Sequence, residues 1–187
     1  MRVIGGRYRG RTVECPPGVI RPAMDKMRES VFGSLGDLSG CSFLDLFSGS
    51  GSVGIEAASR GADPVVLVER DRRKLSVIRR NMAIVQTGIT LAAEPAERYL
   101  RRATRAFDLL FMDPPFDYRF KVDLLRKADQ SVAVGESTVV LIHYPTPESL
   151  PTRIGTLEQI DRRVYGGSTV AWYRRGNSTE PSDSLPE

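Results

Sequence analysis

The stretch FLDLFSGSGSVGIEAASRGA, residues 43–62, joins a short apolar run to three spaced glycines and then to an alanine-rich segment. The apolar run predicts a buried strand and the alanine-rich segment predicts a helix, so the glycines fall in the turn between them. Gly49, Gly51 and Gly54 have the G-x-G-x-x-G spacing, which lets a backbone approach a ligand closely and lets the helix pack tightly against the strand. The spacing alone also suits a purely structural glycine turn.

Outward from this unit, the chain alternates apolar runs with helical stretches. We expect strands at 42–46, 65–68, 89–92, 107–112 and 138–143, and helices at 53–59, 72–85, 96–103 and 121–133. This order is typical of α/β proteins, in which helices cover both faces of a mostly parallel sheet. Two more apolar runs, 157–164 and 169–174, flank the turn sequence YGGS and predict an antiparallel hairpin at one edge of the sheet.

The chain divides into three predicted parts. Residues 1–36 form an N-terminal extension, with a small β-hairpin in the first thirteen residues and an amphipathic helix from Asp25 to Gly36. Residues 37–175 form the main domain. Residues 176–187 are polar and lack large apolar side chains apart from one leucine, so we expect a disordered tail.

Composition limits the class of protein. A chain of 187 residues with 41% hydrophobic composition can bury one sizeable core. Since no stretch approaches the roughly 18 apolar residues of a membrane helix, we expect a cytoplasmic protein without membrane contact. Cys15 and Cys41 lack partners at metal-ligand spacing, so we expect neither a metal site nor a disulfide. The only histidine, His143, ends the apolar run VVLIH and could act as an acid or base in a cleft, but without a visible partner we interpret it as structural.

Positive charge is concentrated at the N-terminus. Residues 1–29 hold seven basic residues against three acidic ones, which accounts for the whole net charge of +4. Clustered arginines on a short appendage suit contacts with the phosphates of a nucleic acid. A solvated basic hairpin without a partner would have the same composition.

Two acidic residues indicate what the glycine turn binds. Glu69 ends the second predicted strand, where a carboxylate can accept hydrogen bonds from both hydroxyls of a ribose. This arrangement serves NAD and S-adenosylmethionine alike. Asp45, just before the glycines, suits the ammonium group of S-adenosylmethionine and is poorly suited to a pyrophosphate, so it favours the methyl donor. A structural capping role for Asp45 and a ligand-free Glu69 are the alternatives.

The sequence Asp113-Pro114-Pro115-Phe116 follows the predicted strand 107–112. Ligands of doubly wound sheets bind at the carboxyl ends of the strands, and two prolines fix a backbone and remove two amide donors. Asp113 and the Pro114 carbonyl can accept both N–H groups of an aromatic amine, and Phe116 can stack on a base turned out of its helix or loop. The tetrad therefore predicts methylation of an exocyclic base amine; a structural Pro-Pro turn is the alternative.

These motifs together resemble a known family. DLFSGSGSVGIEA followed by DPPF is similar to the class I S-adenosylmethionine-dependent methyltransferases that act on amino nitrogens. The segments RVIGGRYRGR, RPAMDKMRES and RRVYGGSTVAWYRR further resemble the bacterial 16S rRNA guanine-N2 methyltransferases of the RsmD type, from residue 2 to about residue 174.

The resemblance implies a Rossmann-like, seven-stranded methyltransferase sheet and methylation of N2 of one guanine in 16S rRNA, within assembled 30S subunits. S-adenosyl-L-methionine is the implied donor, S-adenosyl-L-homocysteine the product, and no metal is expected. We also expect a monomer. The implied catalytic residues are Asp113, Pro114, Pro115 and Phe116; the cofactor residues are Asp45, Phe47, Gly49, Ser50, Gly51, Gly54, Glu69, Arg70, Glu94 and Ala96; and the RNA-binding residues are Arg7, Arg9, Arg11, Arg21 and Arg28.

The chain departs from the family pattern at two places. The family's Arg-Pro-Thr is Arg21-Pro22-Ala23 here, which removes a hydroxyl. Where the adenine ring usually meets Asn or Asp, the chain has Ala93-Glu94-Pro95-Ala96, so Glu94 or the Ala96 backbone takes that place.

Three other functions use some of the same features. An NAD-dependent oxidoreductase would share the glycine turn and Glu69 but leave DPPF without a role. A methyltransferase acting on DNA adenine, DNA cytosine or a protein glutamine would use the same cofactor. However, fewer than 190 residues leave little room for a DNA target-recognition domain, and the basic arm of residues 1–29 favours a structured polyanion. A non-catalytic RNA-binding module would not need Asp113.

Overall fold

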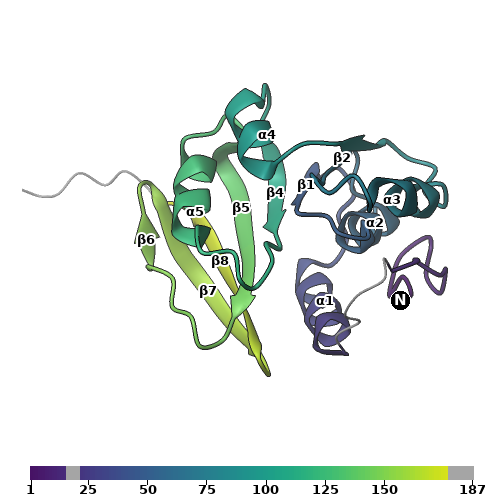
Figure 1. The fold of residues 1–187 in the computed structure, drawn as a ribbon, viewed down its shortest axis with the longest axis horizontal. Coiled ribbons are helices and arrows are strands. Elements are labelled where there is room, and N and C mark those ends of the chain that lie inside the picture. The colour runs from purple at the N-terminus through teal and green to yellow at the C-terminus, as the bar shows by residue number, and fades with distance from the viewer. Residues whose placement is uncertain (16–21, 177–187) are drawn as a thin grey trace, which may run out of the picture.

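The computed structural model describes residues 1–15 and 22–176 as an α/β fold (Figure 1). Its helices are α1 (Pro22–Leu35), α2 (Ser52–Ser59), α3 (Leu75–Met82), α4 (Ala96–Arg102) and α5 (Lys121–Asp129). Its strands are β1 (Phe43–Leu46), β2 (Val65–Val68), β3 (Ile89–Ala92), β4 (Phe107–Met112), β5 (Val134–Pro145), β6 (Arg153–Ile154), β7 (Leu157–Tyr165) and β8 (Ser168–Arg175). The alternation predicted from the apolar runs is confirmed.

All the strands join one sheet in the order β3-β2-β1-β4-β5-β8-β7-β6. Strands β1 to β5 pair in parallel, whereas β8 runs antiparallel to β5 and forms a hairpin with β7. The prediction of seven strands is wrong by one, because the described sheet has eight. The additional strand, β6, spans only Arg153–Ile154, which is too short for an alternating pattern to be visible in the sequence.

Two apolar layers hold helices against the two faces of the sheet. On one face, α4 and α5 bury Leu100, Leu124 and Leu125. On the other face, α1, α2 and α3 bury side chains that include Phe32 and Ile78. The expectation of helices on both faces is therefore confirmed. The inner parallel strands β1, β2 and β4 are almost entirely buried, whereas the edge strand β3 is only partly buried.

The N-terminal extension packs against α2. A single antiparallel bridge joins Arg2 to Thr12, so the first thirteen residues form a tight loop with one bridge rather than a regular hairpin. Val3, Tyr8 and Val13 bury their side chains beside Ile55 of α2. The predicted disordered tail lies outside the described residues from 177 onward, and Arg21 lies outside them as well.

The observed bounds of several elements differ from the predicted bounds by a few residues. Strand β5 begins at Val134, before the expected start at 138, because it continues through the polar sequence GES. Helix α3 covers only Leu75–Met82 of the predicted 72–85. No described helix is long and apolar enough to cross a membrane.

Candidate active site

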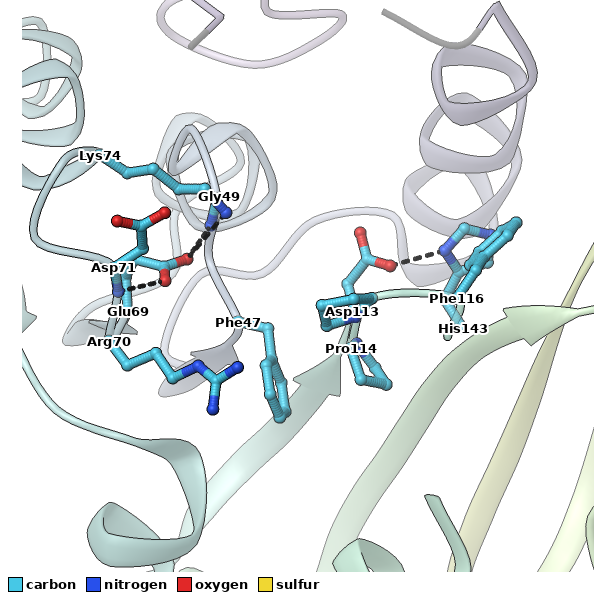
Figure 2. A pocket seen from close by; sticks show the side chains of 11 residues that line it. Phe47, Gly49, Glu69, Arg70, Asp71, Lys74, Asp113, Pro114, Phe116 and His143 are labelled. Carbon is cyan, nitrogen blue, oxygen red and sulfur yellow. Dashed lines mark hydrogen bonds and ion pairs between the residues drawn. The ribbon is translucent and has the colours of Figure 1, made fainter. Parts of the chain in front are cut away.

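A cavity of about 470 Å³ opens at the carboxyl ends of the parallel strands. Figure 2 shows Glu69 and Gly49 on one side of it and Asp113 and His143 on the other. Its walls come from four neighbouring strands of the sheet, β2, β1, β4 and β5. The lining residues are Phe47, Gly49, Glu69, Arg70, Asp71, Lys74, Asp113, Pro114, Pro115, Phe116 and His143.

The glycine turn has the close packing predicted from its spacing. A side chain at Gly54 would place its Cβ 2.1 Å from Cδ2 of Leu67, so the helix lies directly on strand β2. Gly51 adopts a φ of 80°, which an L side chain rarely tolerates. Phe47 also has a positive φ, 64°, although it is not a glycine. This conformation accompanies a ring that lines the cavity, in edge contact with Tyr118 at 5.5 Å between centroids.

Glu69 connects the end of β2 to the glycine turn. Its Oε2 accepts the Gly49 N–H at 2.9 Å, and its Oε1 accepts the Asp71 N–H at 2.8 Å (Figure 2). The Lys74 ammonium lies 3.9 Å from Oε2. Each carboxylate oxygen has further acceptor capacity, so Glu69 can still receive hydroxyl groups from a ligand.

Asp45 lies beneath the glycine turn and is not part of the cavity lining. Its side chain is buried, and Oδ2 accepts the Gly54 N–H at 3.2 Å. Oδ1 is buried and has no hydrogen-bond partner among the described residues. Burial raises the pKa of Asp45 well above its ordinary value, and the nearby Asp113 carboxylate raises it further. A cationic group bound at the turn would give Oδ1 the interaction partner that it lacks.

Asp113 forms a hydrogen bond that the sequence analysis did not foresee. Its Oδ1 lies 2.8 Å from Nδ1 of His143, whose side chain is 1% exposed (Figure 2). Strands β4 and β5 pair in parallel with Met112 opposite Ile142, so the next residues of the two strands are adjacent. The pairing of β5 with β4 in this register, for which the local sequence holds no signal, places His143 beside Asp113. Its interpretation as structural overlooked this neighbour.

A buried lysine forms hydrogen bonds with the backbone of the loop after β4. Lys121, 3% exposed, donates from Nζ to the carbonyls of Phe116 at 3.0 Å and Tyr118 at 2.7 Å, and it pairs with Glu148 at 2.9 Å. The Phe116 ring meets the His143 ring edge to face at 5.4 Å. The two prolines and Lys121 together fix the backbone that presents Asp113.

The structure does not bring every predicted cofactor residue to the cavity. Glu94 pairs with Arg98 and Arg102, and the hydrogen bond from Arg102 lowers the pKa of Glu94. The Ala96 side chain is buried. Neither residue lines the cavity, and Ser50, Gly51 and Gly54 lie behind its surface. Asp71 and Lys74 line it without having been predicted.

The basic arm lies away from the cavity. The Arg7 N–H donates to the carbonyl of Ser59, at the end of α2 opposite the glycine turn, and its guanidinium donates to Gln86 beyond the far end of α3. Arg28 is 3% exposed and donates to Asp25 and to the carbonyl of Arg2. This burial gives Arg28 a structural contact between α1 and the N-terminal loop.

Comparisons with known proteins match nearly the whole chain. The family model described as "Conserved hypothetical protein 95" matches residues 1–174. "Putative rRNA methyltransferase YlbH" of Bacillus subtilis (strain 168) is 33% identical over 184 residues, covering 94% of this chain and 99% of that protein. "Ribosomal RNA small subunit methyltransferase D" of Escherichia coli (strain K12) is 30% identical over 179 residues, covering 94% of this chain and 90% of that protein.

Solved structures show the same fold. "Putative methyltransferase yhhF from Escherichia coli" superimposes with a TM-score of 0.84 at 27% identity, covering 94% of this chain and 97% of that one. "SMU.776, a putative methyltransferase complexed with SAH" has a TM-score of 0.67 at 14% identity, covering 83% of this chain and 50% of that one, and supports the fold alone. The predicted Rossmann-like methyltransferase fold is confirmed. Because the family model and two relatives of at least 30% identity span nearly all of it, the chain belongs to the family described as "Conserved hypothetical protein 95", which contains the RsmD-type methyltransferases.

Proposed function

We propose that this chain methylates the exocyclic N2 amine of a guanine in 16S rRNA, presented in the assembled 30S subunit, with S-adenosylmethionine as donor. The observation that carries the proposal is the single cavity that joins the Asp113-Pro114-Pro115-Phe116 loop to the glycine turn and Glu69. The relatives named as ribosomal RNA methyltransferases support the choice of acceptor. An activity on ribosomal RNA implies a cytoplasmic enzyme, and we propose that it acts as a monomer.

The residues around the glycine turn fit S-adenosylmethionine. The unpartnered Oδ1 of Asp45 suits an ammonium group, and Glu69 retains acceptor capacity for ribose hydroxyls. Arg70 and Phe47 border the same cavity and would enclose the adenosine part. When bound, the donor supplies an electrophilic methyl group.

The loop after β4 suits the acceptor. An aromatic amine is a weak nucleophile because its lone pair is delocalised into the ring. Asp113 and the Pro114 carbonyl would accept its two N–H groups and fix the direction of that lone pair. The Asp113 carboxylate would also offset the positive charge that develops on the nitrogen and take up its proton. Phe116 would stack on the extruded base.

The experiment is methyl transfer from tritiated S-adenosylmethionine to 30S subunits, naked 16S rRNA and duplex DNA, followed by nucleoside analysis. We expect label in N2-methylguanosine from 30S subunits. Label in a DNA base would contradict the acceptor, and calorimetry that detects NAD binding but no S-adenosylhomocysteine binding would contradict the enzyme class.

The variant that tests the proposed role of Asp113 is Asp113→Ala. We expect it to lose turnover while its affinity for S-adenosylhomocysteine stays within about threefold of wild type, because Asp113 faces the acceptor side of the cavity. A non-catalytic RNA-binding protein would show no methyl transfer in either form.

A further inference from the structure

One buried ring, that of His143, contacts both the side chain proposed to bind the base amine and the ring proposed to stack on the base. His143 Nδ1 lies 2.8 Å from Asp113 Oδ1, and the His143 ring lies edge to face with Phe116 at 5.4 Å between centroids. Figure 2 shows the second oxygen of Asp113 directed away from His143. The two contacts tie the proposed amine acceptor and the proposed stacking ring to the same residue.

His143 is much more constrained than Asp113. It lies within strand β5, paired with Val170 of β8, one residue beyond the last β4–β5 pair. Its side chain is 1% exposed, whereas that of Asp113 is 18% exposed and lies beyond the end of β4. A buried ring on a strand paired in the sheet has little rotational freedom, so it can fix the rotamer of a carboxylate that would otherwise turn.

The hydrogen bond also defines where the imidazole proton lies. An ionised carboxylate only accepts hydrogen bonds, so the contact requires a proton on Nδ1. A neutral imidazole carries one proton, which leaves Nε2 bare. Nε2 is buried and has no hydrogen-bond partner among the described residues. The ring therefore has a hydrogen-bond acceptor beside Nδ1, whereas none of the described groups forms a hydrogen bond with Nε2.

We propose that His143 is a positioning residue for methyl transfer. Its Nδ1–H holds Oδ1 of Asp113, so that Oδ2 remains free to accept an N–H of the amine. His143 itself makes and breaks no covalent bond. The inference rests on the proposed function, because it assigns His143 to the same amine-binding loop.

Three substitutions separate the hydrogen bond from the volume of the ring. His143→Asn places an amide donor near the position of Nδ1, His143→Gln places one near Nε2, and His143→Leu removes both. We expect the Gln and Leu variants to lower the single-turnover rate by about 10–100-fold, because small displacements of a reacting group cost this much. The Asn variant should keep most of the rate. Affinity for S-adenosylhomocysteine and the KM for 30S subunits should stay within about threefold in all three.

The control is Tyr144→Phe. Tyr144 is the next residue of β5 and points to the other face of the sheet, where it packs in the layer formed by α4 and α5. Its hydroxyl contacts Arg162 at 3.3 Å. Removing this hydroxyl should leave the rate unchanged, so that a loss of rate in the His143 variants is not a general effect of altering β5.

A second measurement requires no substitution of His143. Because the sequence contains one histidine, the imidazole 15N signals of the tag-free protein belong to His143 alone. We expect a protonated Nδ1 and a bare Nε2 at neutral pH, and a change of the Nδ1 signal in Asp113→Asn. A bare Nδ1, or a signal unaffected by Asp113→Asn, would overturn the inference.

The outcomes also distinguish this inference from the proposed function. If the wild-type chain transfers methyl groups to rRNA and His143→Leu is equally fast, the positioning role is wrong and the proposed function stands. If the wild-type chain transfers no methyl group to any acceptor, the proposed function fails and the positioning role fails with it.

Discussion

Asp45 has an environment that disfavours its own charge. It is buried, it lies near Asp113 and Glu69, and one of its oxygens lacks a hydrogen-bond donor among the described residues. Since the native state raises the pKa of Asp45, stability decreases as the pH rises from the ordinary aspartate pKa to the raised one. A cation bound beside Asp45 would lower its pKa again, because it favours the ionised carboxylate. Binding of such a cation would therefore be coupled to release of a proton from Asp45.

This coupling gives a test with two ligands. S-adenosylhomocysteine carries an ammonium group, whereas 5′-methylthioadenosine lacks the amino-acid part. Asp45→Asn should weaken S-adenosylhomocysteine by about 10–100-fold, the range for a hydrogen bond to a charged group, and change 5′-methylthioadenosine by less than about threefold. Titration calorimetry measures both.

The same calorimetry should show proton release. In wild type, affinity for S-adenosylhomocysteine should rise with pH up to the raised pKa of Asp45 and then level off, and the heat should depend on the ionisation enthalpy of the buffer. Asp45→Asn should abolish both dependences. Equal weakening of the two ligands would contradict a contact with the ammonium group.

At this scale the sequence predicts residues at strand ends well and partners across strands poorly. Glu69 and Asp113 could be placed because each directly follows an apolar run that ends at the ligand-binding edge. His143 could not be paired without knowing that β5 lies beside β4 and in which register. Glu94 was expected at the adenine, and the sequence did not reveal that its carboxylate pairs with Arg98 and Arg102.

Among the elements, the loop between β4 and α5 depends on Lys121. Two loop carbonyls and Glu148 surround its buried ammonium, so the first residue of α5 holds the loop that carries Phe116. Nothing in the local sequence distinguishes this lysine from a surface one, because its burial arises from the chain segment that follows β5.

Lys121→Met should therefore loosen the loop and destabilise the fold. Leaving these partly buried carbonyls without their donor costs about 1–3 kcal/mol, which corresponds to a decrease in Tm of about 3–10 °C for a chain of this size. Thermal unfolding followed by circular dichroism measures it. The control is Lys127→Met, on the same helix, whose side chain is 41% exposed and pairs with Asp123. Equal effects of the two substitutions would contradict the special role of Lys121.

The elements themselves were largely predictable. Strand β2 is a continuous apolar run and β4 is apolar except for Asp108, and the predicted bounds of both agree with the structure. The start of β5 was missed because its first residues are polar, and β6 was missed because two residues show no periodicity. The N-terminal loop was expected to be a hairpin. Its two ends do pair through an antiparallel bridge and backbone hydrogen bonds, but the pairing is short, and Tyr8 and Val13 also pack beside Ile55 of α2.

For the whole molecule, the position of the basic arm decides how RNA could lie on it. Arg7, Arg9 and Arg11 are exposed, and Arg7 contacts the ends of α2 and α3 that lie farthest from the cavity. We propose that the arm binds RNA phosphates at a distance from the target base. A long structured RNA could span both places, whereas a short oligonucleotide could not.

Replacing Arg7, Arg9 and Arg11 together by alanine should weaken binding of 30S subunits or 16S rRNA and reduce the slope of log K against log salt by about 2–3, as expected for up to three phosphate contacts. Filter binding over a range of salt concentrations measures this slope. The control is the triple alanine variant of the exposed Arg98, Arg101 and Arg105, which changes the charge equally on another surface. Affinity for S-adenosylhomocysteine should not change. An unaltered slope would place the RNA surface elsewhere.

The neighbouring positions of β1 and β4 in the sheet have a consequence for assembly of the site. These strands are paired, yet about 60 residues of chain separate them, and the chain's two halves supply opposite walls of the cavity. The cavity is therefore complete only when both halves are folded together. A small molecule that contacts both walls would therefore stabilise the association of the two halves. If the backbone were cut near residue 104, that molecule would promote binding of the two fragments to each other.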